Sequence, residues 1–183
     1  MAIALDPAAS QFRDSDGSYR MAGERLSSLE MIELYGQLAD AFPIWSIEDG
    51  LGKDDTDGWR QLTERLGERL QLLGDDNFVT KAAIIERAIA DRIGNAVLIK
   101  VNQVGTVTET LAAMQLCRKH HYAQMVSHRS GETGDDFIAD LAVATGCGQL
   151  KSGAPARGER VIKYNRLLRI AAQRPDLAYG LAG

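Results

Sequence analysis

The stretch NAVLIKVNQVGT, residues 95–106, places a lysine inside an apolar run. Ala96 to Ile99 have the composition of a strand that is buried on both faces, as in a parallel sheet, and Val101 is expected to continue it. Such a strand offers no favourable place for the ammonium of Lys100, because burying an unpaired charge is strongly unfavourable. The conflict predicts that Lys100 points into a site that needs it.

The rest of the chain repeats the same alternation of short apolar runs and amphipathic stretches. The runs rich in strand-forming residues span 3–6, 42–49, 70–76, 96–103, 123–130 and 148–152. The stretches with apolar residues at helical spacing span 27–42, 58–70, 80–94, 106–121, 135–146 and 158–173. Ser27 and Glu30 predict a capping box, and Thr80 or Asp135 is expected to cap in the same way. This alternation predicts βαβ units in a parallel sheet, either a (β/α) barrel or an open doubly wound sheet.

Composition narrows the class of protein. The 183 residues are 45% hydrophobic and 25% charged, which predicts one domain over residues 1–183, with a loosely ordered tail from about residue 174. The net charge of −4 argues against a nucleic-acid partner. No apolar stretch is long enough to span a membrane, and residues 1–20 carry no secretory signal. Cys117 and Cys147 are expected to be free thiols, and the expected location is cytoplasmic.

Polar residues recur where the predicted strands end. They are Asp6, Glu48, Asp75, Lys100, His128 and Lys151. The successive gaps from Glu48 onward are 27, 25, 28 and 23 residues, or one βα unit each. Because the C-terminal ends of parallel strands share one face, and that face holds the active site in barrels, we expect all six to converge.

Taken singly, each of these residues has a simpler explanation. Asp6 and Asp75 are suited to helix caps or turns, and Glu48 to the polar end of a strand. Lys100 can extend its charged end to the surface over a buried stem, and His128 can be a hydrogen-bonded core residue. The joint placement at six strand ends favours a site instead.

The cluster restricts the chemistry. Converging carboxylates repel one another unless a cation lies between them, and an all-oxygen set without paired His or Cys suits Mg²⁺ or Mn²⁺ rather than zinc. A lysine beside such a cation has a lowered pKa and serves as a general base, which is the role expected for Lys100. Arg129, Ser130 and Lys151 add an anion site for a phosphate or carboxylate substrate.

Several long motifs resemble one known family. They are LDPAASQF, SIEDGL, GDDNFVT, LIKVNQVGT, SHRSGETGDDFIADLAVAT and GQLKSGAPARGERVIKYNRLLRI. Over about residues 3 to 170 they resemble the C-terminal part of enolase, the Mg²⁺-dependent lyase of glycolysis and gluconeogenesis. The resemblance implies an enolase-type (β/α) barrel that is incomplete here, with about six βα units.

The resemblance also implies residue roles. Asp6, Glu48 and Asp75 match the family's Mg²⁺ ligands, with two ions in a complete site. Lys100 matches the base that takes the proton from carbon 2 of 2-phospho-D-glycerate, and the product is phosphoenolpyruvate. A lysine base with Mg²⁺ is the established pattern of this superfamily. The residues that match substrate contacts are Lys100, His128, Arg129, Ser130 and Lys151, with Arg129 and Ser130 on the phosphate and Lys151 on the carboxylate.

The same resemblance implies that the family's N-terminal domain and first barrel elements are absent from this sequence. The region that carries the general-acid glutamate is then absent too, and its loss is expected to lower activity roughly 10²- to 10⁴-fold. One alternative is a non-catalytic, truncated enolase-like protein that binds Mg²⁺ or a partner. Another is a superfamily racemase or lactonising enzyme, which the phosphate and carboxylate motifs disfavour. Family members are commonly homodimers, and some also appear at the cell surface or are secreted.

Overall fold

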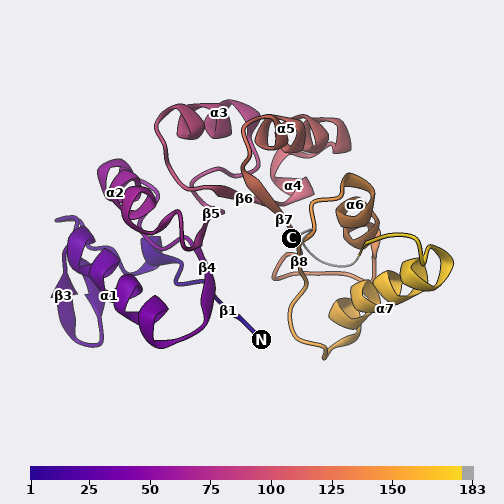
Figure 1. Cartoon of the computed structure of the whole chain (residues 1–183), viewed down its shortest axis with the longest axis horizontal. Helices are drawn as coiled ribbons and strands as arrows, with labels where there is room; N and C mark the ends of the chain where they lie inside the picture. Colours follow the sequence, from indigo (N-terminus) through magenta and orange to yellow (C-terminus); the bar gives the residue numbers. More distant parts are fainter. Residues whose placement is uncertain (179–183) are drawn as a thin grey trace.

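The computed structural model describes residues 1–178, which form a curled parallel sheet with helices on its convex side (Figure 1). The sheet has six strands in the order β1-β4-β5-β6-β7-β8, and every neighbouring pair is parallel. Its strands are β1 (Ile3–Leu5), β4 (Ile44–Glu48), β5 (Gln71–Gly74), β6 (Ala96–Ile99), β7 (Ala123–Ser127) and β8 (Leu150–Lys151). The curl matches an incomplete (β/α) barrel and excludes the open doubly wound sheet.

Helices connect successive strands and form the outer layer. They are α1 (Ser28–Ala41), α2 (Thr56–Leu66), α3 (Ala82–Ala90), α5 (Val107–Lys119) and α6 (Phe137–Thr145), and α7 (Gly158–Gln173) follows β8. Shorter elements are the 3-10 helix η1 (Ala9–Gln11), the one-turn helix α4 (Val101–Val104), and an antiparallel hairpin of β2 (Tyr19–Met21) and β3 (Glu24–Leu26). Within residues 1–178, no helix has both the length and the apolar character needed to cross a membrane.

Strand side chains divide between two apolar regions, as the alternation of a pleated strand requires. Leu72 and Val97 belong to clusters that include helix residues, so they face the outer layer. Their neighbours Leu73, Ala96 and Leu98 form a separate buried cluster on the concave face. Burial on both faces explains why the strands are continuously apolar in sequence.

One of the predicted helix caps, at Ser27, holds as predicted. The Ser27 hydroxyl accepts the Glu30 backbone N–H, and the Glu30 carboxylate accepts the Ser27 N–H, which completes the capping box. Asp135 does not cap in the predicted way: its carboxylate accepts the N–H of Phe137, the first residue of α6, but the N-cap is Asp136, whose side chain makes no cap hydrogen bond. The prediction for Thr80 is wrong, because its hydroxyl is fully buried against Leu98 and Gln103 instead of bonding an N–H of α3.

The central strand is shorter than predicted. It ends at Ile99, and Val101 begins α4 rather than continuing the strand. The backbone N–H of Lys100 donates to the Thr80 hydroxyl, 3.0 Å away, instead of to a neighbouring strand. At the other end of the chain α7 ends at Gln173, and residues 179–183 of the expected loose tail lie outside the described residues.

Candidate functional site at the C-terminal edge of the sheet

The structure places all six polar residues at the C-terminal edge of the sheet. Asp6, Asp75, Lys100 and His128 directly follow β1, β5, β6 and β7, whereas Glu48 and Lys151 are the last residues of β4 and β8. Hydrogen bonds and ion pairs join them in two groups, Lys100 with Asp75 and Lys151 with Asp6, Glu48 and His128, and the negative charges of Asp6 and Asp75 both act on Glu48. The convergence expected from parallel topology is therefore present.

Lys151 links two of the three carboxylates. Its Nζ lies 2.8 Å from Asp6 Oδ2 and 2.6 Å from Glu48 Oε2. Burial raises the pKa of Glu48 to about 7, with smaller contributions from Asp6 and Asp75, and the bond from Lys151 opposes this rise. Burial acts to lower the pKa of Lys151, but its two carboxylate partners outweigh that effect and raise it.

Lys100 is paired with the third carboxylate. Its ammonium donates to Asp75 Oδ2, and both side chains are largely buried. The other oxygen, Oδ1, accepts a hydrogen bond of 3.0 Å from Gln103 Nε2. Lys100 is therefore directed into the site, as the sequence predicted, and two side chains at the start of the β6–α5 connection hold Asp75.

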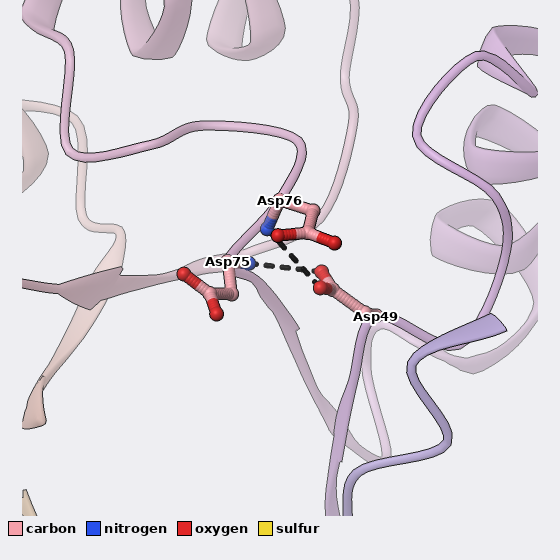
Figure 2. Close-up of side chains that lie close together, drawn as sticks. All are labelled: Asp49, Asp75 and Asp76. Carbon is pink, nitrogen blue, oxygen red and sulfur yellow. Dashed lines mark hydrogen bonds between the residues drawn. The ribbon is translucent and has the colours of Figure 1, made fainter. Parts of the chain in front are cut away.

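Asp49 performs a different task from the carboxylates beside it. Its two oxygens accept the backbone N–H groups of Asp75 and Asp76, at 2.9 and 3.1 Å (Figure 2). Burial raises the pKa of Asp49 to about 6, and the two N–H bonds oppose this effect. Carboxylate oxygens of the three residues lie within 4.8 Å of one another, yet the Asp75 carboxylate points away from Asp49 (Figure 2). Asp49 thus fixes the backbone that carries Asp75.

The loop after β7 carries the predicted anion contacts. His128 Nδ1 lies 2.8 Å from the Lys151 carbonyl oxygen, so Nδ1 carries the proton and Nε2 is the acceptor of the neutral ring. Burial lowers the pKa of His128, which favours this neutral form. Arg129 Nη1 donates to Asn102 Oδ1 at 2.9 Å, and the Ser130 side chain is exposed.

The donor set suits a hard cation. Asp6, Glu48 and Asp75 offer only oxygen atoms, the preferred ligands of Mg²⁺. Burial is the main cause that raises the pKa of Glu48, and a cation beside the carboxylate would oppose that effect. The chemistry of this donor set therefore fits Mg²⁺, although among residues 1–178 the carboxylate oxygens that lie within 4.8 Å of one another are those of Asp49, Asp75 and Asp76.

Sequence reasoning missed three residues that shape the site. Gln103 binds Asp75, Asn102 binds Arg129, and Thr80 holds the backbone of Lys100. Asn102 and Gln103 reach these partners because α4 replaces the end of the predicted strand. Polar residues at 102 and 103 were a signal that the buried strand had already ended.

Comparison with known proteins identifies one family. The family model described as "Enolase, C-terminal TIM barrel domain" matches residues 1–179. A curated relative named enolase, from Rubrobacter xylanophilus, is 56% identical over 170 residues. The alignment covers 92% of this chain but 39% of the relative, so the chain spans well under half of that protein's length.

Proposed function

The chain belongs to the enolase family, and we propose that it carries the metal, base and anion-binding part of a site that reversibly dehydrates 2-phospho-D-glycerate to phosphoenolpyruvate. The observation that carries the proposal is the pair of ion-paired groups at one edge of the sheet, Lys100 with Asp75 and Lys151 with Asp6 and Glu48. The remaining contributions, including the general acid, are proposed to come from elements outside these 183 residues.

Asp6, Glu48 and Asp75 are the proposed ligands of Mg²⁺, with two ions in the complete site. The cation would supply positive charge that stabilises the negative charge developing on the substrate carboxylate. Lys151 and Lys100 pair with the same carboxylates. Metal binding therefore requires these ammonium groups to release at least part of their hydrogen bonds.

Lys100 is the proposed general base. With Asp75 engaged by the cation, the Lys100 amine would lose its ion-pair partner and become able to take the proton from carbon 2. Gln103 remains within reach of Asp75 and would keep that carboxylate oriented. The hydroxyl would then leave carbon 3 with a proton from the proposed general acid outside these residues, so that one water molecule is released while Lys100 holds the proton from carbon 2.

The residues proposed to contact the substrate's phosphate and carboxylate lie at the same edge of the sheet. Arg129 and Ser130 are proposed to bind the phosphate, as the resemblance to enolase implies, and their exposed side chains on the loop after β7 are accessible for it. Lys151, freed from Asp6, is proposed to bind the substrate carboxylate. His128 would offer Nε2, since Nδ1 is held by the Lys151 carbonyl.

The test pairs turnover with binding, both measured on the purified chain with excess Mg²⁺. We expect Mg²⁺-dependent binding of phosphoenolpyruvate by calorimetry, and any phosphoenolpyruvate formation from 2-phospho-D-glycerate to fall by roughly 10²-fold or more in Lys100→Ala. Lys119→Ala, an exposed lysine at the end of α5, is the matched control and should change neither result. A folded chain that shows neither binding nor turnover would contradict the proposal and favour a non-catalytic role.

A further inference from the structure

Two cationic side chains of α7 are buried beneath the loop that joins β7 to α6. Arg160 is 8% exposed and Lys163 is fully buried, and they lie three residues apart on one face of the helix. Arg and Lys are almost never fully buried unless they are paired. Their partners therefore indicate what they do.

Arg160 binds the backbone of the two residues assigned to the phosphate. Its Nη1 donates to the Arg129 carbonyl at 2.9 Å, and its Nη2 donates to the Ser130 carbonyl at 3.0 Å. The planar guanidinium presents these two donors in a fixed fork, so it sets the positions of both carbonyls together. The side chains of Arg129 and Ser130 remain exposed on the other side.

Lys163 binds the far end of the same loop. Its ammonium donates to the Thr133 carbonyl and the Glu159 carbonyl, both at 2.7 Å, and pairs with Glu132 Oε2 at 2.6 Å. An ammonium has three donors, and all three are used. The loop is thus fixed near both of its ends by one helix.

Arg160 also contacts the loop after β8. Gly153 has a φ of +77°, and a Cβ added there would lie 3.2 Å from Arg160 Cδ. Gly153 follows Lys151 by two residues, so the Arg160 side chain lies between the loop with the proposed phosphate contacts and the loop with the proposed carboxylate contact.

We propose that Arg160 and Lys163 are positioning residues, which hold residues 128–134 in the arrangement that presents Arg129 and Ser130 to the substrate phosphate. This inference rests on the proposed function. A loop without regular secondary structure would otherwise lose its conformational freedom when the ligand binds, which weakens binding. Here buried charge-assisted hydrogen bonds from α7 hold the backbone of the loop.

The informative variant is Arg160→Lys, which keeps the charge and most of the buried stem but cannot bond both carbonyls through a planar fork. Arg166→Gln is the matched control, because Arg166 lies on the same helix but pairs with Asp140 of α6. Lys163→Met tests the other end of the loop. Three quantities are measured in each variant: backbone NMR order parameters of residues 129–134, affinity for phosphoenolpyruvate with excess Mg²⁺, and affinity for Mg²⁺ alone.

In Arg160→Lys and Lys163→Met we expect the loop order parameters to fall from about 0.85 toward about 0.6. Affinity for phosphoenolpyruvate should weaken by roughly tenfold or more, since small misplacements of binding groups are costly. Affinity for Mg²⁺ alone should not change, because α7 does not contact Asp6, Glu48 or Asp75 through these side chains. Arg166→Gln should match the parent in all three measurements.

Unchanged order parameters in Arg160→Lys would overturn the anchoring, and a mobile loop with unchanged phosphoenolpyruvate affinity would overturn the positioning role. An equal loss of affinity in Arg166→Gln would show general destabilisation and would also overturn it. If the parent chain binds no phosphoenolpyruvate, both the proposed function and the positioning role are wrong. The order parameters then still decide whether α7 anchors the loop.

Discussion

The ammonium of Lys151 lies 2.8 Å from the Asp6 carboxylate, although Lys151 ends one edge strand of the sheet and Asp6 follows the other. The same ammonium contacts Glu48 at 2.6 Å. Glu48 is only 7% exposed, whereas Asp6 is 45% exposed, so the bond to Glu48 contributes more to stability. One lysine therefore joins the two edges of the curled sheet and neutralises a buried carboxylate.

Replacing this lysine should destabilise the metal-free protein. In Lys151→Met, Asp6 and Glu48 lose their shared counter-charge, and we expect the free energy of unfolding to fall by about 2 kcal/mol. If Mg²⁺ binds the same carboxylates, it should restore much of that loss by binding only the folded state. Urea unfolding with a chelator, and again with excess Mg²⁺, measures both effects.

Lys119→Met is the control, because it removes an exposed lysine from the end of α5. It should leave stability nearly unchanged under both conditions. A Lys151→Met deficit of the same size with and without Mg²⁺ would argue against a cation site at Asp6 and Glu48.

Glu48 makes stability depend on pH. Its pKa rises from 4.5 to about 7 on folding, chiefly because of burial, so the folded state holds this proton to a higher pH than the unfolded state does. Stability from this group is therefore fully present below about pH 4.5 and is lost as pH rises toward 7, by about 3 kcal/mol. Urea unfolding at pH 5, 6 and 7 with a chelator present measures this decline, which His128 opposes with a slope of the other sign because burial lowers its pKa.

Glu48→Gln cannot ionise and should flatten the decline. Asp49 contributes a smaller slope of the same sign, because burial raises its pKa from 3.8 to about 6. We therefore expect a reduced slope in the variant rather than none. Identical slopes for the parent and Glu48→Gln between pH 5 and 7 would show that Glu48 is not the buried acid responsible.

The sequence was sufficient to predict the parallel sheet and the edge where the polar residues meet. Strands buried on both faces are continuously apolar, and helices packed on one face show regular spacing, so both signals survive without tertiary information. Parallel topology then places every strand end on one side. The placement of Asp6, Glu48, Asp75, Lys100 and Lys151 followed from that rule alone, whereas their chemical roles came from the resemblance to enolase.

Predictions of local structure were wrong where a tertiary contact decides the conformation. Val101 looks like strand because it is apolar, but the bond from the Lys100 N–H to Thr80 ends the strand there. Thr80 looks like a cap, yet it is buried beneath β6. The β2–β3 hairpin was not predicted from the sequence. Its local signal was Gly23, because Ala22 and Gly23 of the two-residue turn both have positive φ, which glycine favours.

The two cysteines should differ in reactivity. Both are free thiols, as expected, and Cys117 is fully buried in α5 with a pKa that burial raises to about 12. Because the thiolate is the reactive form, Cys117 should resist a thiol reagent at pH 8 until the protein unfolds. The half-buried Cys147 should react faster. In Cys147→Ser the native protein should show almost no labelling, and rapid labelling of that variant would contradict the buried placement of Cys117.

Gly153 gives a test of how tightly α7 packs against the loop after β8. An alanine there would be strained by the φ of +77° and would press its Cβ against Arg160 Cδ, so Gly153→Ala should lower the free energy of unfolding by about 1–2 kcal/mol. Gly158→Ala is the matched control, because an added Cβ at the start of α7 has no neighbouring atom within 4 Å. That control should be as stable as the parent or more stable, by up to about 1 kcal/mol. Equal stabilities of the two variants in urea unfolding would mean that Arg160 is not packed against Gly153, and would remove the contact that links the two loops.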